Sequence, residues 1–349
     1  MKPRERFLGA CRCENVDLTP VWFMRQAGRY LPGYREIRKK HTVVEAVKTP
    51  EICEQITLMP VRELGVDAAV MFADIMTPLE GMGVNFRIEE NVGPIISDPI
   101  RNMTDVEKLR DFDAQRDVPF VLEAVRRVRM KLDHTEHALV GFSGAPFTVA
   151  SYLIEGQPSR DFTNTKKFMY DNPEAWTLLM SKITEMISKY FSAQIEAGVD
   201  AVQLFDSWIG TLSASDYEEF VAPFVERIFK HVGTTHPDTP KIHFGTNTGH
   251  LLKLMKEKRC VDVFSVDWRI TVREARSILG DQTAIQGNME PAVLLASDRE
   301  FVRKRTQQVL DDNGGARGHI FNLGHGILKD TPVENAKFVV DYVHASTAA

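Results

Sequence analysis

Four arginines lie close together near the beginning of the chain and form its most informative chemical feature. Arg25, Arg29, Arg35 and Arg38 all belong to the segment PVWFMRQAGRYLPGYREIR at residues 20–38. Guanidinium groups stay charged at physiological pH and bind carboxylates or phosphates through paired hydrogen bonds. This concentration of positive charge predicts an anion pocket, although an arginine-rich stretch is more often a solvated loop. The position of the segment in the fold decides between the two interpretations.

Polar residues also follow several short apolar runs along the chain. Asp74 comes directly after AAVMFA, and Asp206 and Ser207 come directly after AVQLF. An Asp or Ser at such a junction is either a helix N-cap or a functional group at the edge of a sheet. As a buried anion that faces the arginines, Asp74 could stabilise positive charge that develops on a substrate. The other residues of interest at such positions are Arg25, Arg29, Ser143, Gly144, Asn247, Asp267, Asn288 and His325.

Two further side chains have types suited to binding or proton transfer. His325 lies between two glycines in the segment NLGHG, where a titratable imidazole could bind a carboxylate or simply occupy a glycine-rich turn. Tyr152 lies about ten residues after an apolar run, where a tyrosine usually packs with its hydroxyl at the surface. No Ser-His-Asp or Cys-His nucleophile pattern is evident. The four cysteines are too scattered for a disulfide framework, and their spacing does not suit a structural zinc site.

The elements that must position these residues alternate between strands and helices. Eight apolar runs separated by stretches of helical periodicity imply a parallel sheet and match a closed (β/α)8 barrel, whose active site lies at the C-terminal ends of its strands. An open doubly wound sheet is the alternative, but no glycine-rich dinucleotide turn follows the first run. We therefore predict one α/β domain of residues 1–349, a TIM-type barrel. The predicted strands are residues 21–24, 68–72, 138–142, 201–205, 241–244, 261–266, 283–287 and 319–323.

One connection departs from the alternation. Residues 81–104, GMGVNFRIEENVGPIISDPIRNMT, are punctuated by Gly and Pro after the second predicted strand. We expect an extended excursion there, forming a surface hairpin or a lid. The clearest predicted helices are residues 173–197, 215–232, 297–312 and 332–345.

Composition and charge exclude several classes of protein. The chain has 48 Asp plus Glu against 43 Lys plus Arg, for a formal net charge of −5. Proteins that bind nucleic acid usually carry a basic domain, so no nucleic-acid partner is predicted. The segment MKPRERFLGACR has no apolar signal region, and no apolar run approaches the length that spans a bilayer. These features predict a cytoplasmic protein without membrane association.

The chain closely resembles the uroporphyrinogen decarboxylase family over nearly its full length. The segments that carry the resemblance, in family order, are PVWFMRQAGRYLP, ADIMTPL, GFSGAPFTVASYLIEG, LFDSW, VDWR, IQGN and FNLGHG. The resemblance implies a single-domain (β/α)8 barrel that forms a homodimer and uses neither metal nor organic cofactor. It further implies decarboxylation of the four acetate side chains of uroporphyrinogen III to methyl groups, which gives coproporphyrinogen III in heme biosynthesis.

The resemblance also implies which side chains contact the substrate, with Asp74, Arg25 and Tyr152 as the catalytic residues. One departure from the family pattern is Trp208, which stands where some members have His and leaves a catalytic role for that position in doubt. The implied substrate-binding residues are Arg25, Gln26, Ala27, Gly28, Arg29, Arg38, Asp74, Tyr152, Ser207 and His325.

Decarboxylation without a cofactor needs another electron sink, and a protonated pyrrole ring of the substrate could serve. Asp74 would then stabilise the cationic ring. The sequence leaves the proton donor open between Arg25 and a water molecule.

The sequence leaves two other functions open. Corrinoid-dependent methyltransferases of the same superfamily hold zinc through an H-x-C motif and a later Cys, whereas here His243 is followed by Phe and Gly. The missing thiol disfavours that chemistry. A non-catalytic tetrapyrrole-binding protein would need the arginines to bind the carboxylates of its ligand. It would have no turnover that depends on Asp74 or Tyr152.

Overall fold

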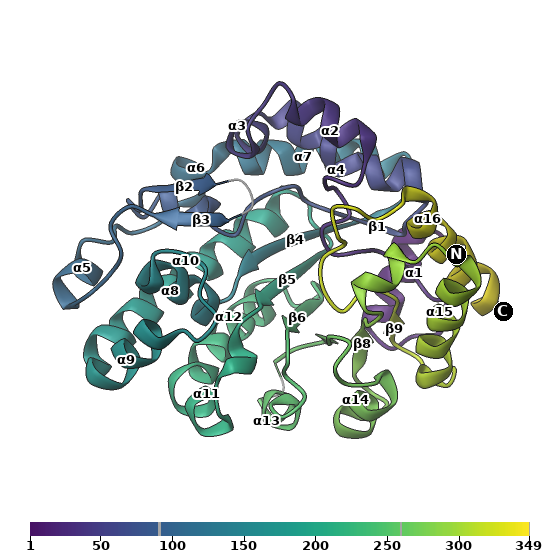
Figure 1. The fold of residues 1–349 in the computed structure, drawn as a ribbon. Coiled ribbons are helices and arrows are strands. Elements are labelled where there is room, and N and C mark those ends of the chain that lie inside the picture. Colours follow the sequence, from purple (N-terminus) through teal and green to yellow (C-terminus); the bar gives the residue numbers. More distant parts are fainter. Residues whose placement is uncertain (90–91, 259, 349) are drawn as a thin grey trace.

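The structure is a computed structural model that describes residues 1–89, 92–258 and 260–348. Its centre is a seven-stranded parallel sheet with the strand order β1-β4-β5-β6-β7-β8-β9. The sheet curls into an arc, and helices cover its outer side (Figure 1). The predicted single-domain α/β architecture with a parallel sheet is confirmed. The strands of this sheet are β1 Ala68–Val70, β4 Ala138–Gly144, β5 Ala201–Asp206, β6 Lys241–Gly245, β7 Val263–Ser265, β8 Ala284–Gln286 and β9 His319–Ile320.

The first predicted strand, residues 21–24, is wrong as a strand. Val21 forms only an isolated parallel bridge with Phe321. The Phe321 N–H donates to the Pro20 carbonyl at 2.9 Å, and the Asp67 N–H donates to the Val21 carbonyl at 2.8 Å. The segment thus lies between β9 and β1, at the eighth position of the barrel. The segment forms no strand ladder because side chains bond to backbone groups that a ladder would use. Asp67 Oδ2, for example, accepts the Val21 N–H at 2.8 Å.

Helices follow the strands in the predicted alternation. Three short 3₁₀ helices are η1 Thr77–Glu80, η2 Ile209–Thr211 and η3 Pro291–Leu295. The α-helices are α1 Pro3–Cys11, α2 Pro32–Arg38, α3 Val43–Lys48, α4 Pro50–Leu64, α5 Met103–Glu107, α6 Ala114–Asp117, α7 Pro119–Asp133, α8 Pro146–Glu155, α9 Thr163–Asp171, α10 Pro173–Ala197, α11 Ala214–Phe220, α12 Ala222–Thr235, α13 Leu252–Glu257, α14 Val272–Leu279, α15 Arg299–Asn313 and α16 Val333–Thr347.

Three of the predicted helices match α10, α15 and α16 closely. The predicted helix at residues 215–232 is instead divided at Val221 into α11 and α12. Pro223 explains the division, because proline lacks an N–H and its ring clashes with the preceding turn of a helix.

The main core lies between the sheet and the outer helices. The longest helix, α10, presents Trp176, Ile183, Ile187 and Phe191 to it, and all four are 0–1% exposed. Their spacing of three to four residues, or a multiple of it, places them on one helical face. This buried face anchors α10 beside β4 and fixes the frame on which the loops at the strand ends are built.

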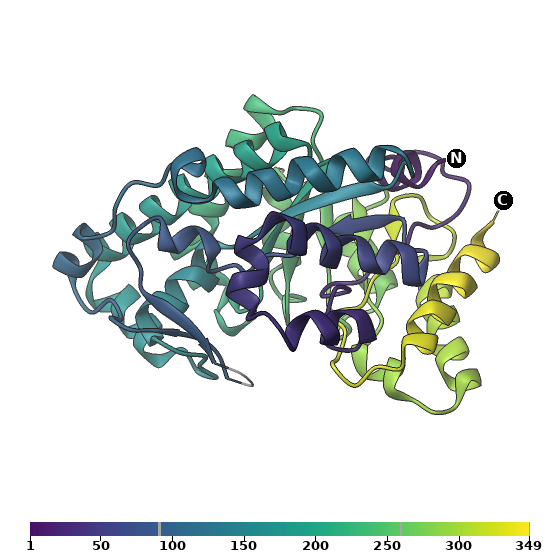
Figure 2. The same cartoon turned by 90° about the horizontal axis from the view of Figure 1, so that it is seen from above.

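A separate antiparallel hairpin follows β1. Strand β2, Phe86–Glu89, pairs with β3, Gly93–Ile96, inside the range 81–104 that the sequence singles out, whereas residues 90 and 91 of that range lie outside the described residues. Figure 2 shows this hairpin, α2 and the yellow segment after β9 along one edge of the molecule. A role as a lid stays a prediction.

Buried polar side chains tie the arginine-rich segment to the inside of the barrel. The Trp22 indole N–H donates to Gln286 Oε1 at 2.9 Å. The Gln286 amide in turn donates to Gln203 Oε1 and Ser265 Oγ, both at 2.9 Å. These bonds link β5, β7 and β8 to Trp22, so the residues that follow Trp22 start from a fixed position.

Within the described ranges, no helix is both long enough and apolar enough to cross a membrane.

Candidate active site

A cavity of about 360 Å³ lies beside the arginine-rich segment, at the C-terminal ends of β1, β4 and β5. Its position agrees with the active-site face of parallel barrels. The predicted site residues that line it are Arg25, Ala27, Gly28, Arg29, Asp74, Tyr152 and Ser207. The arginine-rich segment is therefore part of a concave site and not only a solvated loop.

The backbone around Arg25 is held on both sides. Arg25 has a φ of 59°, in the left-handed region that non-glycine residues rarely adopt. Its side chain packs against Gly326 of the loop after β9, where the absence of a Cβ leaves room for it. The Ile327 N–H donates to the Met24 carbonyl at 2.8 Å. Segments distant in the sequence therefore meet at Arg25.

Asp74 lies in the cavity after β1. Its Oδ1 accepts the Met76 N–H at 2.9 Å, so the side chain closes a turn before η1 and does not cap a helix. Burial raises the pKa of Asp74, while the Met76 N–H and the charge of Arg25 act in the opposite direction. A carboxylate in these surroundings interacts strongly with any positive charge that enters the cavity.

Tyr152 projects from α8 into the same cavity and does not place its hydroxyl at the outer surface. Its ring packs against Trp208 with the ring centroids 4.3 Å apart, and Trp208 also contacts Phe162 at 4.7 Å. Burial and the negative charge of Asp74 raise the pKa of Tyr152 to about 12. The hydroxyl thus stays protonated at neutral pH and can donate a hydrogen bond to a ligand.

Gln26 is part of the arginine-rich segment, but its side chain is fully buried. It donates to the Ala68 carbonyl at 2.9 Å and accepts the Phe23 N–H at 3.0 Å. The first bond anchors the segment to β1, and the second fixes the turn within the segment itself. The Gln26 side chain does not line the cavity.

Arg38 and His325 also lie outside the cavity lining. Arg38 ends α2, and its guanidinium donates to the His41 carbonyl. The His325 ring contacts Phe244 edge to face, with centroids 6.0 Å apart. Burial and the charge of Arg25 lower the pKa of His325 to about 4. His325 is therefore neutral at physiological pH and could offer a carboxylate only an N–H.

Comparison with known proteins shows which family the chain belongs to. The family model described as uroporphyrinogen decarboxylase (URO-D) matches residues 2–346. The chain belongs to the uroporphyrinogen decarboxylase family. A relative of that name from Sorangium cellulosum (strain So ce56) is 49% identical over 341 residues, which cover 98% of this chain and 96% of the relative. Another from Thermus thermophilus is 48% identical and covers 98% of both chains.

Solved structures support the fold of this uroporphyrinogen decarboxylase family member. A methyltransferase from Methanosarcina mazei matches with a TM-score of 0.80 at 20% identity and covers 99% of both chains. A putative vitamin-B12 independent methionine synthase from Listeria monocytogenes matches with a TM-score of 0.59 at 12% identity, covering 97% of this chain and 98% of that one. At these identities the likeness concerns the fold alone.

Several residues that line the cavity were not predicted from the sequence. Phe142 and Phe205 lie near the ends of β4 and β5, and their place in the apolar runs could have indicated them. Lys329 follows His325 in the last strand-to-helix segment, which is also a usable signal. Pro94 reaches the cavity from the hairpin, which no local pattern reveals. The other lining residues are Trp22, Tyr34, Val43, Val70, Met71, Phe72, Ala73, Ile75 and Ile327.

A metal site would need several ligating side chains close together. In the part of the chain that the structure describes, no group of three or more His, Cys, Asp or Glu side chains could hold a metal ion. His243 instead faces Asp206 from β6, with Nε2 and Oδ2 3.5 Å apart. The expectation of a metal-free enzyme stays a prediction.

Two histidines with lowered pKa values predict acid sensitivity of the fold. Burial lowers the pKa of His319 and of His325 to about 4, against an ordinary value of 6.5. Below about pH 6.5 the unfolded chain binds protons that the folded chain does not, so stability falls as the pH drops towards 4. Thermal melts of the wild type and of His325→Gln across this range test the prediction. The variant should show the shallower fall, and an equally steep one would contradict it.

Proposed function

We propose that this protein decarboxylates the four acetate side chains of uroporphyrinogen III to methyl groups and so produces coproporphyrinogen III. The observation that carries the proposal is the cavity in which Asp74 and Tyr152 lie with Arg25 and Arg29. Family membership and the names of the relatives support it. A substrate with many carboxylates and a ring that becomes cationic suits a cavity with several cations around one half-buried acid.

The chemistry proposed for each acetate arm needs no electron acceptor other than the substrate. A proton adds to the pyrrole carbon that bears the arm and makes the ring cationic. The bond between the CH₂ and the carboxylate then breaks, CO₂ leaves, and the electron pair forms an exocyclic double bond that neutralises the ring. A second proton adds to the CH₂ carbon, and the ring carbon loses its proton. The net change replaces CO₂ with one proton and leaves a methyl group.

The residues have distinct parts in this proposal. The Asp74 carboxylate stabilises the cationic ring and orients it through the pyrrole N–H groups. Arg25 and Arg29 bind carboxylates of the arms, and the Tyr152 hydroxyl donates a hydrogen bond inside the cavity. Ala27, Gly28 and Ser207 form part of the wall. Arg25 and a water molecule are the two candidates for the proton donor.

Gln26, Arg38 and His325 have indirect roles in the same proposal. The Gln26 side chain is buried and hydrogen-bonded in the core, so only the Gln26 backbone could contact the substrate. Arg38 supports α2, which brings Tyr34 to the cavity. Neutral His325 packs against Phe244, near enough to Arg25 to feel its charge. The β2–β3 hairpin, which supplies Pro94, forms a lid over the cavity mouth.

The proposal extends to the cellular setting and assembly of the protein. A cytoplasmic homodimer without metal, organic cofactor, nucleic-acid partner or membrane contact agrees with the family resemblance and with the net charge of −5. Sedimentation of the purified protein across a range of concentrations tests the dimer. The likeness to the Methanosarcina mazei methyltransferase concerns the fold, and no observation on the described residues favours methyl transfer.

An anaerobic incubation with freshly reduced uroporphyrinogen III tests the reaction. EDTA is present and no cofactor is added, and samples are oxidised and separated by carboxylate number. Successive porphyrins with fewer carboxylates, ending at the tetracarboxylate, are expected. Recovery of uroporphyrin alone from folded protein would contradict the proposal, and activity that only an added metal restores would contradict its metal-free form.

Lys329 gives a separate prediction about substrate binding. Among the described residues, it is the third cation that lines the cavity, beside Arg25 and Arg29. We expect Lys329→Ala to raise KM roughly 2- to 5-fold with little change in kcat, since an exposed ion pair contributes about 0.2–1 kcal/mol. The effect should shrink as salt is added.

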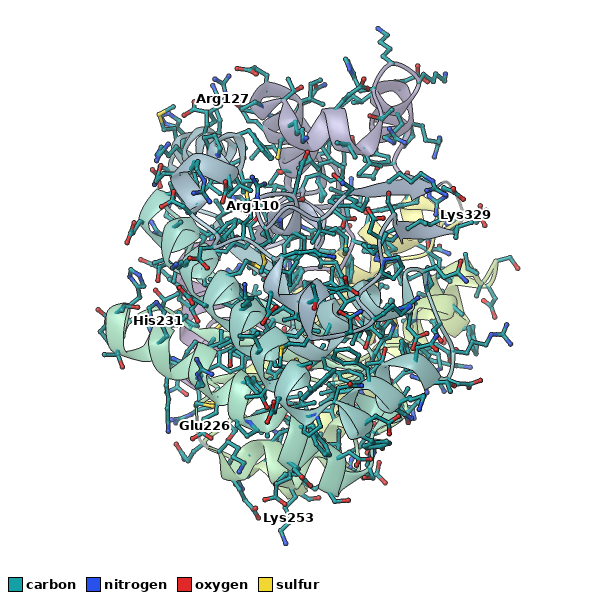
Figure 3. The ribbon with its side chains drawn as sticks, turned by 90° about the vertical axis from the view of Figure 1, so that its left-hand side faces the viewer. Arg110, Arg127, Glu226, His231, Lys253 and Lys329 are labelled. Atoms are coloured by element: carbon teal, nitrogen blue, oxygen red, sulfur yellow. The ribbon has the colours of Figure 1, made fainter. Side chains whose placement is uncertain are left out.

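The matched control is Lys253→Ala. Lys253 is an exposed lysine of α13, and Figure 3 labels the two lysines at separate edges of the molecule. The control should leave KM unchanged. An unchanged KM for Lys329→Ala at low ionic strength would exclude Lys329 from substrate binding.

A further inference from the structure

A buried polar cluster that the proposed mechanism does not use lies behind the cavity wall. Its members are Asp206, Thr148 and His243, which are 0%, 1% and 1% exposed. The Thr148 hydroxyl donates to Asp206 Oδ1 at 3.0 Å. The His243 Nε2 lies 3.5 Å from Asp206 Oδ2. A carboxylate so completely buried is costly unless its neighbours compensate for the lost water.

Each of the two hydrogen-bonded partners belongs to an element that carries a cavity residue. Asp206 is the last residue of β5 and directly precedes Ser207. Thr148 lies one helical turn before Tyr152 on α8. The bond between Thr148 and Asp206 therefore joins the helix that carries Tyr152 to the strand end that carries Ser207.

A second contact between the same two elements lies close by. The Tyr152 ring packs against Trp208, two residues after Asp206, at a centroid distance of 4.3 Å. Residues four apart on a helix share one face, so the two contacts follow one line along α8. Two contacts on one face limit both the sliding and the rotation of the helix. Without the Thr148 hydroxyl, the connection between α8 and the end of β5 would be weakened one helical turn from Tyr152.

His243 connects the cluster to the neighbouring strand. It lies on β6, which pairs with β5, and its ring packs against Phe229 with centroids 5.6 Å apart. The imidazole thus lies beside the second carboxylate oxygen, although neither Nε2 nor Oδ2 has a hydrogen-bond partner among the described residues. Asp206 is thus held between α8 on one side and β6 on the other.

We propose that Asp206 is a positioning residue, which acts through Thr148 to hold Tyr152 and Ser207 in fixed relative positions at the cavity wall. The activity tests of this inference rest on the proposed decarboxylase function. Asp206 touches no substrate in this arrangement, and its effect on the reaction passes through the two cavity residues.

Thr148→Val is the sharpest variant, because it removes one hydroxyl at nearly constant volume. We expect kcat/KM to fall about tenfold. This loss lies between the effect of removing a single hydrogen bond and the ~100-fold loss of rate that a 1 Å misplacement can cause. Thr148→Ser keeps the hydroxyl and should retain activity close to that of the wild type. Equal activity of the Val and wild-type proteins would overturn the proposal.

Thr306→Val separates positioning from simple stabilisation. Thr306 is also fully buried, and its hydroxyl donates to the Val302 carbonyl at 2.9 Å within α15. This variant should lose stability, as Thr148→Val does, but it should keep its kcat/KM when assayed well below its Tm. A matching loss of activity in both variants would mean that Thr148 acts only through stability.

A double-mutant cycle with Tyr152→Phe tests the route of the effect. If Thr148 acts through the Tyr152 hydroxyl, Thr148→Val should cost much less in the Tyr152→Phe background than in the wild type. Fully additive losses would contradict the proposed route.

A crystal structure of Thr148→Val distinguishes a failure of this inference from a failure of the proposed function. The expected result is a shift of Tyr152 relative to Ser207, and unchanged positions of both would overturn the inference whatever the activity. If the wild type converts no uroporphyrinogen, the proposed function fails, while this structure still decides whether Asp206 and Thr148 hold Tyr152 in place.

Discussion

Asp74→Asn is expected to fold and to lose roughly 100- to 1,000-fold in turnover, the scale seen when one preorganised electrostatic partner is removed. The substitution removes the negative charge that lies in the cavity near Arg25. An Asn oxygen can still accept the Met76 N–H, which Asp74 Oδ1 accepts at 2.9 Å, so the turn before η1 should persist. Chromatography of the oxidised products by carboxylate number measures the loss.

The stability of the same variant should change in the opposite direction. Burial raises the pKa of Asp74, which means that the folded protein disfavours the charged carboxylate. A neutral amide avoids that cost, so the Tm of Asp74→Asn near neutral pH should equal or exceed that of the wild type. A large fall in Tm would show instead that the carboxylate mainly supports the fold.

The pH dependence follows from the same shift. The charged form of Asp74 is the active one, so activity is present above its pKa and is lost as the pH falls through it. Because that pKa is raised, the acid limb of kcat/KM should lie above the ordinary Asp value of 3.8. The residual activity of Asp74→Asn should lack this limb.

Asp113→Asn is the matched control. Its Oδ1 accepts the Arg116 N–H at 2.9 Å at the start of α6, so the chemical change and the local bond are alike, but the residue is exposed and lies outside the cavity. Wild-type turnover is expected. Near-normal turnover of Asp74→Asn itself would refute the assignment of Asp74 as the stabilising anion.

Arg25→Gln is expected to lower kcat/KM roughly 10- to 100-fold, as the loss of a hydrogen bond to a charged group costs about 1.5–3 kcal/mol. Arg25 lies near enough to Asp74, Tyr152 and His325 to influence the pKa of each, so its charge acts at the centre of the site. Arg25→Lys should recover part of the activity, because Lys keeps the charge but not the paired N–H groups. Full activity of Arg25→Gln would exclude Arg25 as carboxylate ligand and as proton donor.

Gly326→Ala tests the position of Arg25 without removing its charge. A Cβ at residue 326 would lie 2.7 Å from Cγ of Arg25 and closer still to its Cδ, so the side chain must move. We expect a loss of kcat/KM in the same direction as for Arg25→Gln, with the fold intact. Gly233→Ala is the control, since a Cβ there meets nothing within 4 Å, and its activity should equal that of the wild type.

Much of the fold was predictable because its signals are local. Apolar runs that alternate with helical periodicity indicate a parallel α/β sheet, and six of the later runs match β4 to β9. The strand predicted at residues 21–24 was wrong, because the backbone there bonds partly to the Asp67 side chain and forms a single bridge. The helix predicted over residues 215–232 is interrupted at Val221, an interruption that Pro223 could have indicated in the sequence.

The site could be predicted in part, for a topological reason. The C-terminal ends of parallel strands meet at one edge, so Asp74 and Ser207 can be grouped from their places directly after apolar runs. The direction of a side chain cannot be obtained in this way. Gln26 and Arg29 belong to the same short segment, yet Gln26 turns into the core and Arg29 lines the cavity.

The sequence by itself determined the family, the parallel α/β class and the charges available to the site, because these depend on residue types and their spacing. The tertiary structure alone decided that Gln26 turns into the core, that Pro94 reaches the cavity from the hairpin, and that His325 is neutral at physiological pH. Side-chain direction and pKa depend on burial and on charges contributed by distant parts of the chain, and only the folded protein brings those parts together.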